Sequence, residues 1–362
     1  MRIAQIAPLY EAVPPRLYGG TERVVSQLTD TLVGLGHDVT LFASADARTK
    51  SKLVATRDQA IRLDPSPLKS DLAAHIALLH EARRRAADFD ILHFHIDLLH
   101  FPIFENLAYR TITTVHGRLD VKDLPEAYRC WPDYPMVSIS DRQREPLPEA
   151  NWLGTVHHGI AEDTVRFTAT AKEGYLAFLG RISPEKRPDR AIAIARRAGI
   201  PLKIAAKVDD VDRTYFLDTV KPLLEDPLIE FIGEIDDAAK GDFLGNALAL
   251  LFPIDWPEPF GLVMIEAMAC GTPVIAWNCG AVPEVIDRGI TGEIVSSESE
   301  AVAAIERVRC FDRALIRSTF ERRFSSRVMA LNYLALYRKL VQVNESLGML
   351  VAITQKKRVW SS

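Results

Sequence analysis

Two glutamates eight residues apart are the part of the sequence best suited to chemistry. Glu258 and Glu266 lie in the segment WPEPFGLVMIEAMACGT, residues 256–272. A helix is predicted to begin near Leu262, and helix side chains lean toward the N-terminus, so the carboxylate of Glu266 should point back at the loop that holds Glu258. The helix N-terminus, preceded by Gly261, offers backbone N–H donors and favours negative charge. A ligand with many hydroxyls and a phosphate fits this mixture, although an isolated pair of carboxylates is more often simply exposed to solvent.

A glycine and two cations follow another predicted strand, Tyr175–Leu179. Gly180 comes directly after this strand, Arg181 is next, and Lys186 stands five residues beyond Arg181. Two cations at one strand end can neutralise a single diphosphate group. The alternative is that they are ordinary surface residues near the start of a helix, which is the commoner situation for arginine and lysine.

Further candidates also lie at predicted strand ends. Gly19 and Gly20 stand in the loop between the first strand and the first helix, where glycine lets backbone N–H groups approach a ligand closely. His116 ends one strand, and Gly233 with Glu234 follows another. A lone histidine or a glycine pair is weak evidence by itself, and the position at a strand end strengthens it.

The elements that must hold these residues alternate between strand and helix. Apolar residues recur at helical spacing between positions 24 and 35, and short apolar strands flank that helix. Ten strands are predicted: Ile3–Leu9, Val39–Ala43, Ile91–His95, Ile112–His116, Met136–Ile139, Tyr175–Leu179, Leu202–Ala206, Ile229–Ile232, Leu248–Phe252 and Pro273–Ala276. Strands joined through helices form parallel sheets. The prediction is an α/β protein with two doubly wound, Rossmann-like sheets, whose ligands bind beyond the carboxyl ends of the strands.

A polar stretch between Gly159 and Gly174 interrupts this alternation, and we place a hinge there. We predict one domain over residues 1–165 and a second over residues 166–319. The segment over about 320–343 is predicted to be a helix that packs back across both domains.

Composition and charge exclude several classes of protein. The chain has 362 residues, of which 48% are apolar, and this is enough for two domain cores. Its 44 basic and 48 acidic residues give a formal net charge of −4, so no global positive field attracts nucleic acid. No apolar stretch approaches the ~20 residues that span a bilayer, which leaves peripheral membrane contact open. Four widely spaced cysteines and the absence of a signal-peptide pattern predict a cytoplasmic protein.

Other site types are disfavoured. His93, His95 and His100 suggest a metal site, because alternate strand residues share a face. No carboxylate or cysteine stands at ligand spacing, so we favour packing roles and predict no metal and no cofactor. The sequence has neither a GxGxxG after a strand nor a GxxxxGK[ST] motif, and it has no nucleophile elbow. Dehydrogenase, P-loop and hydrolase functions are therefore not supported.

The segment around Glu258 and Glu266 resembles the E-x7-E signature of retaining glycosyltransferase family 4, whose members have the GT-B fold. The likeness extends over nearly the whole chain, from Gly19-Gly20-Thr21-Glu22 through the GRISPEK segment at 180–186 to the Phe324 region. It implies two Rossmann-like domains that face one another across a cleft. It also implies a hexosyltransferase-type enzyme with a nucleotide-diphosphate-sugar donor, for which UDP is the commonest nucleotide.

The resemblance assigns expected roles to this chain's residues. Glu258 would meet hydroxyls of the donor sugar, Glu266 would hold the ribose, and His116 would contact the transferred sugar. Arg181 and Lys186 would clamp the donor phosphates. The remaining expected contacts, to the phosphates, sugar, acceptor or base, come from Phe260, Gly261, Leu262, Gly19, Gly20, Gly180, Gly233 and Glu234.

The same resemblance implies a mechanism without a metal. The leaving diphosphate gains negative charge as the glycosidic bond breaks, so fixed cations stabilise the transition state more than the ground state. The anomeric configuration would be retained through front-face attack, in which the departing phosphate takes the acceptor proton. Such a reaction needs no enzymic nucleophile.

Other functions remain open on sequence grounds. A nucleotide-sugar 2-epimerase shares the two-domain fold, a phosphorylase would normally be much longer, and a non-enzymatic nucleotide-sugar-binding protein would turn nothing over. The acceptor stays unidentified. We expect the loop Glu11–Tyr18 and the region Asp97–Arg110 to shape its site.

Overall fold

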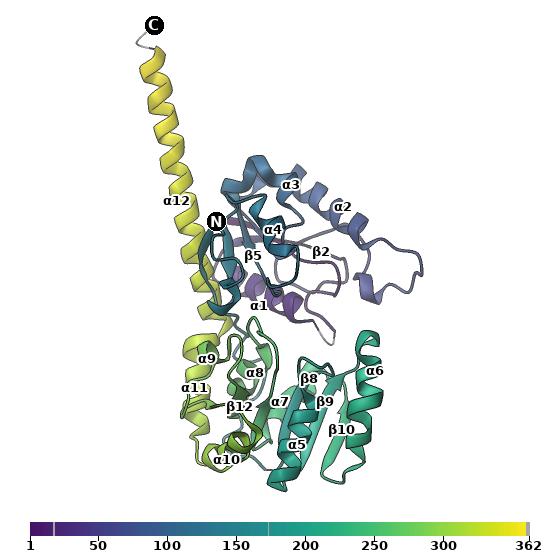
Figure 1. The fold of residues 1–362 in the computed structure, drawn as a ribbon. Helices are drawn as coiled ribbons and strands as arrows, with labels where there is room; N and C mark the ends of the chain where they lie inside the picture. The colour runs from purple at the N-terminus through teal and green to yellow at the C-terminus, as the bar shows by residue number, and fades with distance from the viewer. Residues whose placement is uncertain (17–18, 173, 360–362) are drawn as a thin grey trace.

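The chain forms two α/β halves, one above the other in Figure 1. The structure is a computed structural model that describes residues 1–16, 19–172 and 174–359. A seven-stranded sheet has the order β3-β2-β1-β4-β5-β6-β7, and a six-stranded sheet has the order β10-β9-β8-β11-β12-β13. The strand pairs described in both sheets are parallel. Two doubly wound sheets are thus present, as the sequence predicts.

The N-terminal half carries the first sheet. Its strands are β1 (Arg2–Ile6), β2 (Asp38–Ala43), β3 (Lys52–Ala55), β4 (Ile91–Phe94), β5 (Thr111–Thr114), β6 (Met136–Ser138) and β7 (Trp152–Thr155). Its helices are α1 (Gly20–Gly34), α2 (Asp71–Arg84), α3 (Phe101–Phe104) and α4 (Leu124–Arg129). Short 3-10 turns cover Ile61–Leu63, Ala86–Asp88, Glu105–Arg110 and Arg142–Arg144.

The C-terminal half carries the second sheet. Its strands are β8 (Leu176–Arg181), β9 (Leu202–Lys207), β10 (Ile229–Gly233), β11 (Ala249–Phe252), β12 (Val274–Trp277) and β13 (Gly292–Val295). Its helices are α5 (Pro188–Ala198), α6 (Arg213–Tyr215), α7 (Asp237–Gly245), α8 (Leu262–Cys270), α9 (Val282–Val285), α10 (Glu298–Val308) and α11 (Arg313–Phe324). A short π-helix covers Phe216–Val220, and 3-10 helices cover Asp210–Asp212 and Lys221–Glu225.

All ten predicted strands are present, and three further strands were missed. The missed strands β3, β7 and β13 stand at sheet edges. Interior parallel strands are buried on both faces and read as apolar runs, such as the fully buried β4 and β11. Two of the missed edge strands lack that signal, since β3 is largely exposed and β7 is half-buried throughout.

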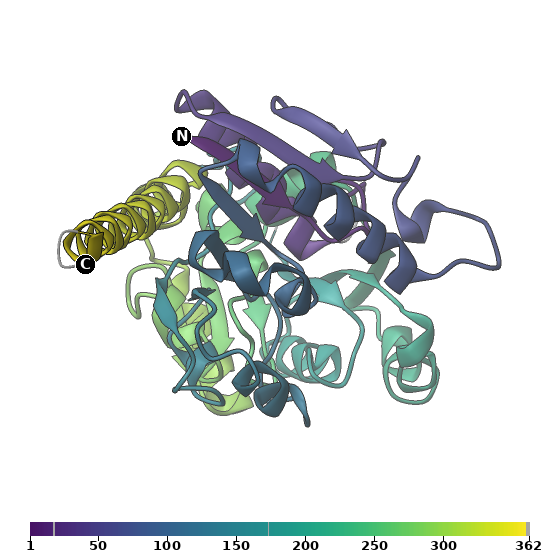
Figure 2. The same cartoon turned by 90° about the horizontal axis from the view of Figure 1, so that it is seen from above.

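The helix expected over about 320–343 is two helices. The backbone of Ser325 is extended and ends α11, and α12 (Ser326–Val359) begins immediately after it. Helix α12 then runs along the N-terminal half and continues beyond it, at one edge of the molecule in both views (Figure 1, Figure 2). Tyr333 and Tyr337 of α12 are fully buried in the same apolar cluster as Val24 and Leu28 of α1. The last helix therefore completes the core of the first half.

The chain passes between the two halves at two adjacent points. Ile160 N donates to the carbonyl oxygen of Phe324 at 3.1 Å, and Ser326 N donates to the carbonyl oxygen of Ile160 at 2.8 Å. A Cβ atom at Gly159 would lie 2.4 Å from the carbonyl oxygen of Ser325, a distance that real Cβ atoms do not adopt. Glycine is required here because the two segments touch. This crossing lies in the region expected to contain a hinge, whereas the domain boundaries near 165 and 319 remain predictions.

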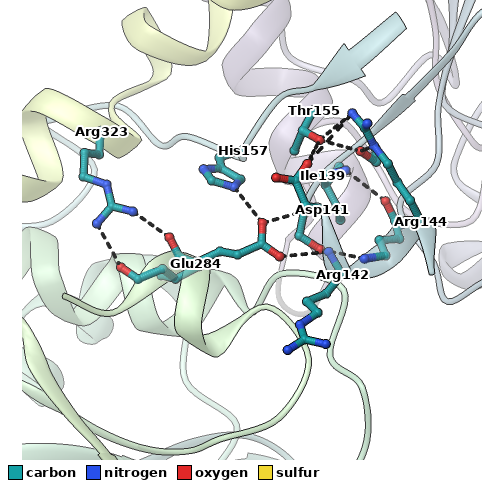
Figure 3. A network of polar contacts seen from close by, with 12 residues as sticks. Ile139, Asp141, Arg142, Arg144, Thr155, His157, Glu284 and Arg323 are labelled. Carbon is teal, nitrogen blue, oxygen red and sulfur yellow. Dashed lines mark hydrogen bonds and ion pairs between the residues drawn. The ribbon is translucent and has the colours of Figure 1, made fainter. Parts of the chain in front are cut away.

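A second contact between the halves is centred on Glu284 of α9 (Figure 3). Its carboxylate accepts hydrogen bonds from the backbone N–H groups of Asp141 and Arg142 at 2.8 and 2.9 Å, and it lies 3.3 Å from His157 Nε2. Arg323 of α11 donates to the main-chain carbonyl of Glu284 at 2.5 Å. One carboxylate of the C-terminal half thus binds a turn of the N-terminal half.

Candidate active site

A cavity of about 720 Å³ lies between the two sheets. Its lining includes residues at the carboxyl ends of strands in both halves, where doubly wound sheets bind ligands. Lys207 ends β9 and Phe252 ends β11, while His95 and His116 follow β4 and β5. The topology therefore brings together residues that are far apart in the sequence.

Helix α8 directs its N-terminus at this cavity, because Gly261, Leu262 and Val263 all belong to the lining. Gly261 has φ 88°, a left-handed conformation that glycine adopts readily, and a Cβ atom there would lie 3.1 Å from the Phe252 ring. The turn before α8 is thus specified by glycine. The N–H groups of the first helical turn and the positive end of the helix dipole favour an anion at this end.

Glu266 lies on the second turn of α8 and is 5% exposed. Its Oε1 atom accepts a hydrogen bond from Lys240 Nζ of α7 at 2.9 Å. A buried carboxylate needs such a partner, since an unpaired buried charge is costly. Lys240 was not identified from the sequence, because a single lysine inside a helix belongs to no motif.

Glu258 lies in the loop between β11 and α8 and forms an ion pair with Lys186. The same carboxylate oxygen accepts a hydrogen bond from Trp256 Nε1 at 3.0 Å, and the Lys186 ammonium lies 5.0 Å from the Trp256 ring centroid. Gly280 holds this loop closely, because a Cβ atom at Gly280 would lie 2.4 Å from backbone atoms of Glu258. The loop, the lysine and the tryptophan therefore fix the carboxylate beside the α8 N-terminus.

Arg181 is placed differently from the sequence expectation. Its guanidinium lies 3.6–3.7 Å from carboxylates of Glu185, Asp209 and Asp212, and the residue is not part of the cavity lining among the described residues. These distances exceed those of hydrogen bonds. Arg181 Nε is buried and has no hydrogen-bond partner in the part of the chain that the structure describes.

His116 lies in the cavity wall and is bonded to a second histidine. Its Nε2 atom is 2.9 Å from His95 Nδ1, and its ring stacks on His158 with centroids 5.2 Å apart. Burial lowers the pKa of His116 to about 3. The ring is therefore neutral at physiological pH, and one of the two neutral rings donates its N–H to the other.

The histidines considered as metal ligands are hydrogen-bonded inside the N-terminal half. His93 contacts Tyr337 Oη at 2.6 Å and Thr114 Oγ1 at 2.7 Å, and His100 Nε2 contacts Thr113 at 3.1 Å. Within residues 1–16, 19–172 and 174–359, no group of three or more His, Cys, Asp or Glu side chains is arranged to hold a metal ion. These contacts support the packing roles expected for His93 and His100.

The structure brings most of the predicted site residues into one cavity. The residues that line it are Gly19, Gly20, His116, Gly180, Lys186, Glu234, Glu258, Phe260, Gly261, Leu262 and Glu266. Of the described residues predicted for the site, Arg181 and Gly233 do not line it. The N-terminal half adds Tyr10, Arg62 and Asp97 to the wall. Tyr10 lies just before the loop expected to shape the acceptor site and Asp97 begins the expected region, while residues 17 and 18 lie outside the described residues.

Comparison with known proteins agrees with this architecture. The chain matches the family described as "Glycosyltransferase Family 4" over residues 18–194 and the one described as "Glycosyl transferases group 1" over residues 161–310. It is 26% identical to a phosphatidyl-myo-inositol mannosyltransferase of Mycolicibacterium smegmatis, over 96% of this chain and 94% of that protein. It is also 26% identical to a D-inositol 3-phosphate glycosyltransferase of Mycolicibacterium gilvum, over 77% and 74% of the two chains.

Solved structures share the fold at lower identity. AviGT4, a glycosyltransferase involved in avilamycin A biosynthesis, superposes with a TM-score of 0.73 at 23% identity, covering 94% of this chain and 98% of that one. The sucrose-phosphate synthase of Thermosynechococcus elongatus superposes with a TM-score of 0.76 at 20% identity, covering 94% of this chain and 99% of that one. Anabaena Alr3699/HepE, solved with UDP and glucose, gives 0.69 at 16% identity, covering 96% and 100%.

The fold and these matches define a glycosyltransferase with the GT-B fold. The chain belongs to the family 4 type of these enzymes. The sequence-based predictions of family, fold and enzyme class are therefore confirmed. Among the helices that the structure describes, none has both the length and the hydropathy needed to cross a membrane.

Proposed function

We propose that this glycosyltransferase moves a sugar from a UDP-sugar to a hydroxyl acceptor, retains the anomeric configuration and requires no metal. One arrangement carries the proposal. Glu258, Glu266 and Lys186 border a single cavity beside the N-terminus of α8. This combination of two carboxylates, a cation and helix N–H donors suits a ligand that has a sugar, a diphosphate and a ribose.

The donor would be divided among these groups. Glu266, held by Lys240, would accept hydrogen bonds from the ribose hydroxyls, and Glu258 would accept them from the sugar. The α8 N-terminus and Lys186 would bind the diphosphate, which requires Lys186 to release Glu258 at least in part. Stabilisation of the leaving diphosphate by fixed positive groups would accelerate bond cleavage.

Arg181 would join the diphosphate by turning from its present neighbours. Its contacts to three carboxylates are long, and its Nε donor is unused in the described part of the chain. A diphosphate offers shorter, charge-assisted bonds. This exchange would bring a second cation to the charge that develops in the transition state.

Retention is consistent with the neutral state of His116. Because burial lowers its pKa to about 3, His116 is a poor proton acceptor at neutral pH. The leaving phosphate oxygen would instead take the acceptor proton as the new glycosidic bond forms on the same face of the sugar. His116 would orient the sugar through a hydrogen bond.

Relatives suggest the substrates to test first. Alr3699/HepE was solved with UDP and glucose and with UDP-glucose, which supports a UDP-sugar donor. The related mannosyltransferase and the D-inositol 3-phosphate glycosyltransferase are named for mannose and for inositol-containing acceptors. UDP-glucose, GDP-mannose, and free and phosphorylated inositol are therefore the first donors and acceptors to combine.

The test is transfer in the presence of EDTA, with the anomeric configuration of the product read by NMR. Product with the donor's configuration, formed by wild type and formed at least roughly tenfold more slowly by Glu258→Gln and Glu266→Gln, would support the proposal. An inverted product, or activity that returns only with added divalent metal, would contradict it. Substituting the exposed Glu149 with Gln supplies the matched control, because that residue lies outside the cavity lining.

A further inference from the structure

Four alternating charges connect the N-terminal half to the ribose-side glutamate. Arg23 forms an ion pair with Asp237, Asp237 lies 3.2 Å from Lys240 Nζ, and Lys240 Nζ lies 2.9 Å from Glu266 Oε1. Asp237 and Lys240 are three residues apart at the start of α7, so both face the same side of that helix.

Only the first member of this series belongs to the opposite half. Arg23 lies in the first turn of α1, directly after the glycine loop, and its side chain is 6% exposed. Gly20 in the same turn approaches α8, because a Cβ atom there would lie 3.6 Å from Leu262 Cδ1. The ion pair therefore forms where the two halves meet beside the cavity.

The two central groups are each shared by two partners. Asp237 is shared by Arg23 and Lys240, and burial alone would raise its pKa, but the two cations lower the pKa below its ordinary value. Asp237 is therefore ionised at neutral pH. Lys240 is in turn shared by Asp237 and Glu266, and its side chain is only 13% exposed.

We propose that Arg23 is a positioning residue for the donor nucleotide, acting on Glu266 through Asp237 and Lys240. While the halves are in contact, Arg23 neutralises Asp237 and leaves Lys240 to hold the Glu266 carboxylate. Once Arg23 withdraws, Asp237 competes for Lys240, and Glu266 loses its fixed orientation. Nucleotide affinity in one domain thus depends on contact with the other. This inference rests on the proposed function, because it takes Glu266 as the ribose ligand.

A double-mutant series separates this mechanism from a direct contact. We would titrate wild type, Arg23→Met, Asp237→Asn and the double variant with UDP, GDP and ADP by calorimetry. Arg23→Met should lower the affinity for the nucleotide roughly tenfold, which is the contribution of about one charge-assisted hydrogen bond. Asp237→Asn removes the competitor for Lys240, so the double variant should recover most of that loss.

Arg129→Met is the matched control, because Arg129 also pairs with a carboxylate, that of Glu149 at 2.5 Å, and both residues lie outside the cavity lining and outside the series. Its nucleotide affinity should equal that of wild type. Unchanged affinity in Arg23→Met overturns the inference. Failure of Asp237→Asn to restore binding also overturns it, since that result means that Arg23, which lines the cavity, touches the nucleotide itself. If the wild-type protein binds none of the three nucleotides, both the proposed donor site and this inference are wrong.

Discussion

Lys186 and Glu258 are ion-paired at the wall of the cavity, although the proposed mechanism gives them different parts of the donor. Trp256 donates a hydrogen bond to the same carboxylate oxygen, so the pair is held in place. When the donor binds, its sugar would contact Glu258 and its diphosphate would contact Lys186. The ion pair between these two residues must then open. Before the donor binds, the two binding groups therefore neutralise each other.

This relationship predicts opposite effects of one substitution on binding and on transfer. Glu258→Gln should leave UDP affinity at least as strong as in wild type, because UDP lacks the transferred sugar that Glu258 would bind and because Lys186 is released for phosphate. Sugar transfer should fall roughly 10- to 100-fold, since a hydrogen bond to a charged group is lost. Calorimetry with UDP and an initial-rate assay measure the two quantities. A parallel loss of UDP affinity would contradict this account.

Acid should destabilise the fold through its buried histidines. Burial lowers the pKa of seven rings below the ordinary value of 6.5, and the largest shifts are those of His93, His95, His100, His116 and His158. Below pH 6.5 the histidines of the unfolded chain are protonated, whereas these buried rings in the folded chain stay neutral. The free energy of unfolding therefore falls as the pH drops and keeps falling toward pH 3. Each such ring contributes up to about 1.4 kcal/mol per pH unit in that window.

Urea unfolding midpoints at several values between pH 7.5 and 5 would measure this slope. Because His116 has a pKa of about 3 in the folded protein, His116→Gln should make the slope shallower by about one proton. An unchanged slope would show that His116 titrates alike in both states.

The contact between the two crossing segments predicts that a substitution of Gly159 strongly destabilises the fold. Gly159→Ala places a Cβ atom against the Ser325 carbonyl, which should lower the free energy of unfolding by about 2–3 kcal/mol. Gly34→Ala is the control, because a Cβ atom added there, at the end of α1, would have no neighbour within 4 Å in the described part of the chain. That variant should match wild type or gain up to about 1 kcal/mol in thermal or urea unfolding. Equal stability of the two variants would refute the steric argument.

The Glu284 contact predicts an effect on how the two halves are arranged. Glu284→Ala removes the acceptor of two backbone N–H groups from the other half, an interaction worth about 1.5–3 kcal/mol. Small-angle scattering should detect a larger radius of gyration, and the melting temperature should fall. Glu149→Ala removes a salt bridge within the N-terminal half and should change neither quantity appreciably. Scattering identical to wild type would mean that the segment crossing alone sets the arrangement.

The interior of both sheets was predictable from sequence because burial on two faces leaves continuous apolar runs. The missed edge strands gave no comparable signal, because β3 is largely exposed, β7 is half-buried, and β13, although mostly buried, has only four residues that include a glycine and a glutamate. The break at Ser325 was missed for another reason. It arises from the chain crossing beside Gly159, a tertiary contact that helical periodicity does not encode.

Some residues of the candidate site were likewise predictable from the sequence, and others were not. Residues at or directly after strand ends, including Gly180 in the last part of β8 and Glu234 after β10, were placed in the cavity by topology alone. Lys240 and Arg23 could not be predicted, because their importance comes from ion pairs with residues on other elements. The position of Arg181 was also beyond sequence reasoning, since it depends on Asp209 and Asp212 from a neighbouring connection.

The burial of α12 in the first half has a consequence for synthesis on the ribosome. The N-terminal sheet emerges first, yet Tyr333 and Tyr337, which fill its core, are translated near the end of the chain. The second half, whose core needs nothing after α11, can close before the first. We expect nascent chains that stop before Tyr333 to be cleaved by protease in the first half alone. The half made first is then the half that finishes folding last.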